Sequence, residues 1–187
     1  MENFEDKIKA YMEKEKEVLE KLSTEDVNKV INVLEEARKR GAVVYVCGNG
    51  GSAATASHYV TDFNKGISLN CKHKYNLISL NDNIPNMTAI ANDIGYEYVF
   101  EIQLQGKMKP SDILLAISGS GNSKNVLRAA QYAKETGAEV VALTGYDGGG
   151  LYKMADYNIH VPIDNMQITE DIHMILDHLM MSVLMSK

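Results

Sequence analysis

Five short runs of mostly apolar residues, separated by stretches with helical periodicity, constrain the fold of this chain more than any other feature. The runs cover residues 42–47, 75–80, 113–118, 139–144 and 157–162. Continuous apolar strands that alternate with helices are typical of α/β proteins, in which helices cover both faces of a parallel sheet. The fifth run is more polar and ends in proline, so we expect an edge strand there. The sequence therefore predicts a three-layer αβα sandwich.

Helical patterns precede and follow these runs. Residues 1–22 have the spacing of an amphipathic helix with a narrow apolar stripe, which must cover either its own domain or a second subunit. A second helix is expected up to Gly41, and a last one over roughly 167–185. A chain of 187 residues without a linker or repeat suits one domain. We therefore interpret residues 1–187 as a single domain, in which 1–40 form an N-terminal helical extension.

The charge and cysteine content of the chain argue against several classes of protein. The formal net charge is −6, and no basic run marks a nucleic-acid footprint. The charged N-terminus lacks the apolar core of a signal peptide, and no apolar stretch approaches the ~20 residues of a membrane span. Two cysteines, with Cys47 in an apolar run, indicate a reduced chain rather than a disulfide scaffold. We expect a cytoplasmic protein that binds neither nucleic acid nor membranes.

Glycine- and hydroxyl-rich loops follow the first and third apolar runs, at the sheet edge where parallel sheets bind ligands. Glycines let backbone N–H groups approach an anion, and a following helix directs its positive N-terminal end to the same place. Ser118, Ser120, Asn122 and Ser123, which open a helix expected over 122–136, therefore look like a phosphate cradle. A single loop of this kind is often an ordinary turn, but two at equivalent strand ends favour phosphate binding.

Two nucleotide-binding patterns fit these loops poorly. Residues 48–53 loosely match the dinucleotide pattern, which requires a ribose-binding acid about 20 residues later. The next strand instead ends near Asp82, too far along the chain. No loop ends in the Gly-Lys-Ser/Thr of a P-loop. A phosphate carried on a small sugar is the better ligand.

Candidate acids, bases and metal ligands lie on two of the expected helices. His58 and Asp62 are four residues apart and face one side of their helix. Glu170 and His178 are two turns apart, about 80° around the helix axis, whereas His173 lies on a different side. Two histidines and two carboxylates suit a zinc site or an acid–base set. Each pair alone is more often a surface hydrogen bond, and spacing does not bring the two helices together.

Five motifs follow one another along the chain and carry a resemblance to a known family. They are CGNGGSAATASH at 47–58, ANDIG at 91–95, ISGSGNS at 117–123, LTGYDGG at 143–149 and EDIHMILDH at 170–178. With these motifs the chain resembles the sugar isomerase (SIS) domain proteins, and most closely the phosphoheptose isomerases. The resemblance implies a five-stranded parallel sheet and a homotetramer with active sites between subunits. It also implies conversion of sedoheptulose 7-phosphate to D-glycero-D-manno-heptose 7-phosphate.

The same resemblance implies roles for particular residues. The substrate-binding positions of the family fall on Asn49, Gly50, Gly51, Ser52, Asp62, Asn92, Asp93, Ser118, Gly119, Ser120, Ser123 and Glu170. Its zinc-binding positions fall on His58, Asp62, Glu170 and His178, with one zinc ion per subunit. Asp62 and His178 are then the proton-transfer pair. In aldose–ketose exchange, one takes a carbon-bound proton, the other returns one to the neighbouring carbon, and an enediolate forms in between.

Three residues depart from the family pattern. Asp62 stands where the family usually has Glu, Glu170 where it has Gln, and Gly119 where it has Thr. The added charge of Glu170 could tighten zinc binding, whereas the shorter acid reaches less far towards substrate. A displacement of ~1 Å at a reacting group can cost ~100-fold in rate. These departures bear on the substrate and the rate more than on the fold.

The competing interpretation is a non-catalytic phosphosugar-binding regulator. SIS domains also act as sensors, and the 143–149 segment looks much like that of the protein that associates with the DnaA replication initiator. That relative lacks the acid at position 62 and the histidine at position 178. This chain has ionisable groups at all four metal positions, which favours an enzyme.

Overall fold

The computed structural model describes residues 2–186 and contains one five-stranded parallel sheet. Its strands are β1 Val44–Cys47, β2 Leu77–Ser79, β3 Ile113–Ser118, β4 Glu139–Gly145 and β5 Tyr157–Val161, in the spatial order β2-β1-β3-β4-β5. Every neighbouring pair is parallel. All five apolar runs are therefore strands, and the fifth is an edge strand as predicted. The chain runs outward from β1 to β2 and returns to β3 on the other side, so the topological switch point lies between β1 and β3.

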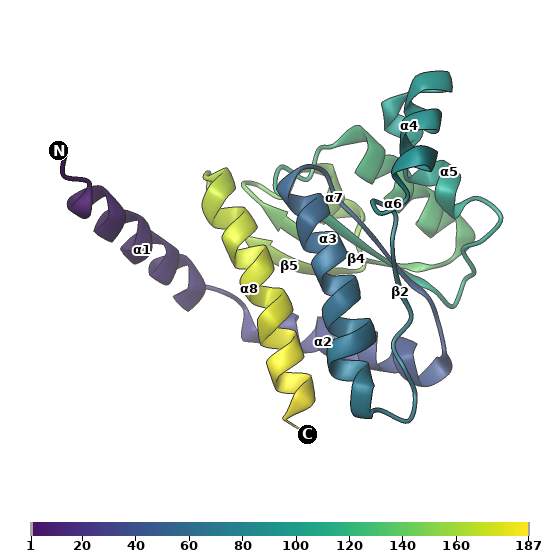
Figure 1. Cartoon of the computed structure of the whole chain (residues 1–187), viewed down its shortest axis with the longest axis horizontal. Helices are drawn as coiled ribbons and strands as arrows, with labels where there is room; N and C mark the ends of the chain where they lie inside the picture. Colours follow the sequence, from purple (N-terminus) through teal and green to yellow (C-terminus); the bar gives the residue numbers. More distant parts are fainter. Residues whose placement is uncertain (1, 187) are drawn as a thin grey trace.

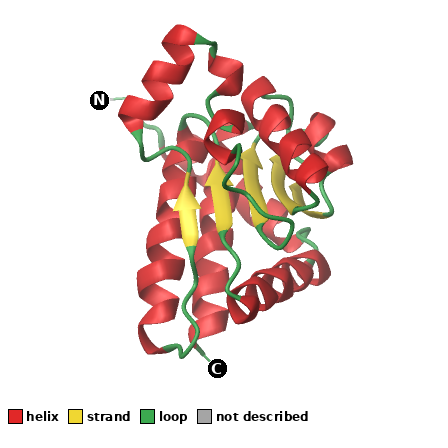
Figure 2. Cartoon of the chain, turned by 90° about the vertical axis from the view of Figure 1, so that its right-hand side faces the viewer, coloured by secondary structure: helices red, strands yellow, loops and turns green. Residues whose placement is uncertain are grey.

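Helices cover both faces of this sheet, which confirms the αβα sandwich (Figure 2). The helices are α1 Glu5–Glu20, α2 Thr24–Arg40, α3 Gly51–Thr61, α4 Ile84–Asp93, α5 Glu101–Leu104, α6 Lys124–Thr136, α7 Gly149–Met154 and α8 Met166–Met185. A π-helical turn, Asp62–Gly66, continues α3 and is followed by a 3-10 turn, Ile67–Asn70; another 3-10 turn spans Tyr96–Tyr98.

The core divides into two apolar layers, because successive strand residues point to opposite faces. Ile113, Leu115 and Ile117 of β3 pack in the layer with α2, α3 and α8. Leu114 and Ala116 pack in the layer with α4, α5, α6 and α7. The central strands are buried on both faces, which explains why their sequences are unbroken apolar runs rather than alternating ones.

Helix α1 projects from the body of the molecule (Figure 1). Of its residues only Val18 is buried, while Phe4, Ile8 and Met12 at its start are exposed. It reaches α8 through a hydrogen bond from the Tyr11 hydroxyl to the Asp171 carboxylate. The predicted amphipathic helix is thus present, but most of its apolar stripe is not covered by any of residues 2–186.

Two local signals explain where α2 begins and ends. The Ser23 side chain accepts a hydrogen bond from the Asp26 N–H at 3.1 Å, and Gly41 ends the helix with a φ of 70°.

No helix within residues 2–186 has the length and apolar character needed to cross a membrane.

Candidate functional site

A cavity of about 240 Å³ lies at the switch point, between the ends of β1 and β3. Its walls are the two glycine-rich loops and the first turns of α8. The lining residues are Asn49, Gly50, Gly51, Ser52, Ile117, Ser118, Gly119, Ser120, Ser123, Met166 and Glu170. The structure therefore brings together both loops that the sequence analysis connected with phosphate binding.

The loop after β3 presents hydroxyl groups and a helix start to this cavity. The hydroxyls of Ser118 and Ser123 are 3.4 Å apart, and Ser120 accepts a hydrogen bond from the Asn122 N–H. Ser123 stands at the N-cap of α6, but its hydroxyl makes no capping bond. The loop turns at Gly121, where an added Cβ would lie 1.9 Å from the Gly148 carbonyl oxygen. Donors and the positive end of a 13-residue helix thus converge on one point, a geometry suited to an anion.

Gly119 and Met166 account for one departure from the family pattern. A Cβ at position 119 would lie 2.8 Å from the Met166 sulfur, so this side chain takes the space that a threonine would need. Met166 also lines the cavity. Where the family has the hydroxyl of a threonine, this cavity therefore has the apolar side chain of Met166.

Glu170 lies at the opposite wall of the cavity, against the start of α3. A Cβ at Gly51 would be 2.2 Å from a Glu170 carboxylate oxygen, so only glycine allows this approach. A carboxylate beside the first turn of a helix interacts favourably with the helix dipole.

The amide of Asn49 is held in place by two residues that the sequence analysis missed. Asn49 and Asn125 exchange two side-chain hydrogen bonds of 2.9 and 2.8 Å, and the Tyr96 hydroxyl donates to Asn49 Oδ1 at 2.8 Å. Asn125 is buried on α6 and Tyr96 lies in a 3-10 turn. Asn92 and Asp93, by contrast, do not line the cavity; they are exposed at the end of α4 and hydrogen-bond each other at 2.7 Å.

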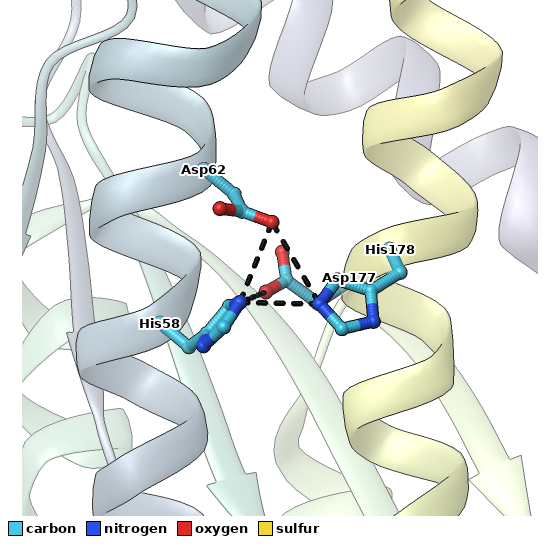
Figure 3. A group of neighbouring side chains, drawn as sticks. All are labelled: His58, Asp62, Asp177 and His178. Carbon is cyan, nitrogen blue, oxygen red and sulfur yellow. Dashed lines mark hydrogen bonds and ion pairs between the residues drawn. The ribbon is translucent and has the colours of Figure 1, made fainter.

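A second cluster lies further along α3 and α8, which pack side by side (Figure 1). It contains His58, Asp62, Asp177 and His178, whose nearest donor atoms all lie within 4.8 Å of one another (Figure 3). The two histidine Nε2 atoms are 3.1 Å apart. Asp62 Oδ2 lies 3.5 Å from His58 Nε2 and 3.9 Å from His178 Nε2. Asp62 also begins the π-helical turn, a distortion that often marks functional sites.

Asp177 is the member of this cluster that the sequence analysis missed. Its side chain is 0 % exposed, and one of its carboxylate oxygens lies 4.0 Å from His58 Nε2. Burial and the negative charge of Asp62 raise the pKa of Asp177 to about 7. A carboxylate at a buried position of α8 is the one signal that could have identified it.

Glu170 and His173 lie elsewhere. Glu170 is not part of the cluster, although its position matches a zinc ligand of the family. His173 is a buried residue of α8, with Nε2 3.4 Å from the Thr144 carbonyl oxygen, and burial lowers its pKa to about 4. The expectation that His173 is the weaker site candidate agrees with this position.

The cluster has the donor set of a zinc site. Around a tetrahedral zinc ion with bonds of about 2.0–2.1 Å, neighbouring donor atoms are about 3.3 Å apart. Four of the separations in the cluster are 3.1, 3.5, 3.9 and 4.0 Å, and all its donor atoms lie within 4.8 Å of one another. Imidazole nitrogens and carboxylate oxygens are both zinc ligands. The residues present therefore fit the metal.

Comparison with known proteins places this arrangement in a family. The SIS domain family matches residues 4–145. A phosphoheptose isomerase of Helicobacter pylori is 37% identical over 172 residues, covering 92% of this chain and 87% of the relative. One of Mycobacterium tuberculosis is 41% identical over 140 residues, covering 75% of this chain and 71% of the relative.

Solved structures agree with this assignment. Phosphoheptose isomerases of Neisseria gonorrhoeae and Francisella tularensis each superpose with a TM-score of 0.90 at 28% identity. The first covers 99% of this chain and 100% of its own, and the second covers 100% of both. The chain belongs to the SIS domain family and, within it, to the phosphoheptose isomerases.

Proposed function

We propose that this protein is an aldose–ketose isomerase that interconverts sedoheptulose 7-phosphate and D-glycero-D-manno-heptose 7-phosphate. One observation carries the proposal: an anion-type cavity and a histidine–carboxylate cluster lie along the same two helices, α3 and α8. His58 follows Gly51 by seven residues, which is about 10 Å along α3. A seven-carbon sugar has its phosphate on C7 and its reacting carbons at C1 and C2, so an extended substrate suits two separated sites.

The cavity binds the phosphate end of the substrate. Backbone N–H groups at the start of α6 and the hydroxyls of Ser118, Ser120 and Ser123 donate to its oxygens. Asn49, Gly50, Gly51 and Ser52 form the facing wall. The support is the convergence of both loops on one cavity. For Asn92 and Asp93, which would bind sugar hydroxyls, the support is the family resemblance alone.

Asp62 and His178 transfer the protons. From the ketose, Asp62 accepts the proton of the C1–H bond, and the electron pair forms the enediolate double bond between C1 and C2. His178 then donates a proton to C2, O1 loses its proton as the aldehyde forms, and O2 gains one. The reverse reaction exchanges the two roles. Asp62 Oδ2 and His178 Nε2 are 3.9 Å apart, so both groups face the same small volume.

His58 Nε2, Asp62 Oδ2 and His178 Nε2 would hold the zinc ion, which leaves Asp62 Oδ1 and His178 Nδ1 for the proton transfers. A bound zinc ion stabilises negative charge on oxygen atoms of an enediolate. The resemblance places Glu170 as the fourth ligand, whereas the cluster in the structure contains Asp177 instead.

The assembly is a cytoplasmic homotetramer with active sites at subunit interfaces. Support for association comes from the unpaired apolar stripe of α1, with Phe4, Ile8 and Met12 exposed on a helix that leaves the body of its own subunit (Figure 1). Light scattering after size-exclusion chromatography should give the mass of four chains. The mass of a single chain would contradict this part of the proposal.

Two substitutions test the catalytic assignment. Asp62→Asn and His178→Ala should abolish turnover of sedoheptulose 7-phosphate, because each removes one proton-transfer group. Phosphosugar binding by calorimetry should persist, since neither residue lines the phosphate cavity. Retained turnover in both variants would refute the assignment. The regulator alternative is not favoured, since the relatives named above are phosphoheptose isomerases and the acid at position 62 and histidine at position 178 are both in the cluster.

A further inference from the structure

Asp177 is a buried carboxylate to which neither the proposed catalysis nor the family resemblance assigns a role. Its side chain is 0 % exposed, and neither of its oxygens has a hydrogen-bond partner among the described residues. An ionised carboxylate without a partner in a protein interior is strongly unfavourable. Such a group therefore points to a missing cation or proton at this place.

The orientation of Asp177 identifies what the group faces. Its carboxylate lies between α3 and α8 and is directed at the histidine pair rather than into the core (Figure 3). One oxygen is 4.0 Å from His58 Nε2, and the donor atoms of all four residues fall within 4.8 Å of one another. The Asp177 carboxylate therefore supplies a fourth donor group beside those of His58, Asp62 and His178.

We propose that Asp177 is the fourth protein ligand of the metal ion, in place of Glu170. The inference rests on the proposed function for the identity of the ion. Glu170 is displaced from the cluster, because its carboxylate lies against Gly51 at the start of α3. His58 is two turns further along that helix, about 10 Å away. Glu170 thereby stays in the cavity, where it faces the substrate.

This ligand set has chemical consequences. Two carboxylates balance the double positive charge of zinc, and two imidazoles complete four donors within one subunit.

Zinc binding by the metal-free full-length chain tests the proposal without reference to activity. Zinc would be titrated against a chromogenic chelator for the wild type and for Asp177→Leu, which cannot ligate. Asp177→Asn keeps the shape of the side chain, Glu170→Leu is the matched control that cannot ligate, and His58→Ala removes a histidine of the cluster. Loss of a residue that merely supports a ligand lowers metal affinity by about 10- to 100-fold, so Asp177→Leu should cost more than about 100-fold. Glu170→Leu should stay within about threefold of the wild type, as expected for a residue outside the metal site.

Thermal unfolding with zinc and with a chelator provides a second readout. Zinc should raise the melting temperature of the wild type and of Glu170→Leu, and the rise should shrink in both Asp177 variants. Circular dichroism shows whether each variant folds. If neither does, the anomalous map of zinc-loaded wild-type crystals decides which carboxylate lies within about 2.2 Å of the ion.

Three results would overturn the proposal: an affinity loss of less than about 100-fold in Asp177→Leu, loss of affinity in Glu170→Leu, or no zinc binding by the wild type. The zinc-binding experiment can fail without the isomerase proposal failing, and the reverse is also true. Turnover by a wild type whose Asp177 variants bind zinc normally would refute this inference alone. Zinc loss in those variants without turnover in the wild type would refute the isomerase alone.

Discussion

The buried histidine of α8 should make the protein sensitive to mild acid. His173 is 0 % exposed, its Nε2 donates to the Thr144 carbonyl oxygen and its Nδ1 has no partner among the described residues. Burial lowers its pKa from 6.5 to about 4. The unfolded chain protonates His173 below pH 6.5 while the folded chain holds it neutral. Its stabilising contribution is therefore complete above pH 6.5 and is lost as the pH falls towards 4.

The size of the pKa shift of His173 determines how much stability the protein loses on acidification. One pKa unit corresponds to about 1.4 kcal/mol, so the loss between pH 7.5 and pH 5 should be about 2 kcal/mol, rising to about 3 kcal/mol at pH 4. Asp177 acts in the opposite direction, because its pKa is raised to about 7 and its protonation on acidification favours the folded state. A control that keeps Asp177 is therefore needed.

His173→Gln is that control, since its amide can still donate to the Thr144 carbonyl oxygen but does not titrate. Urea unfolding would be measured for both proteins at pH 7.5 and pH 5 in the presence of a chelator. The wild type should lose about 2 kcal/mol more than the variant over this interval. Equal losses in the two proteins would refute the reasoning from burial.

Three further substitutions probe the cavity. Gly51→Ala should displace the neighbouring carboxylate and raise KM for the sugar phosphate at least severalfold, measured by steady-state kinetics; an unchanged KM would contradict the close approach. Gly119→Thr should leave the melting temperature nearly unchanged, because the exposed, flexible Met166 side chain can move aside; a large drop would show that Met166 is held in place. Asn125→Ala should remove two hydrogen bonds from Asn49, at about 1 kcal/mol each, and calorimetry should show weaker phosphosugar binding; equal stability and binding would show that Asn49 needs no support.

The five strands could be predicted from the sequence because helices cover both faces of the sheet. All six residues of 113–118 are buried, so the strand is a nearly continuous apolar run that can be recognised without knowledge of its neighbours. The pair His58 and Asp62 was equally visible, since helix geometry alone places residues four apart on one side. Both predictions depend on local geometry.

The missed residues depend on contacts between distant elements. Asp177 occupies a position of α8 that periodicity assigns to the core, and only the packing of α3 against α8 shows that it faces two histidines. Asn125 sits in a helix start where an asparagine is unremarkable, and its partner Asn49 is 76 residues away. The position of Glu170 beside Gly51 was likewise invisible to helix spacing, which relates it only to other residues of α8.

Proton NMR of the purified protein with sedoheptulose 7-phosphate in deuterated buffer, with and without zinc, tests whether the protein is an isomerase. An aldoheptose phosphate should appear, with solvent deuterium at C2, because the proton returned to C2 comes from an exchangeable group on His178. Broadened substrate resonances with neither product nor exchange would contradict this expectation. The chain would then bind the sugar phosphate without isomerising it.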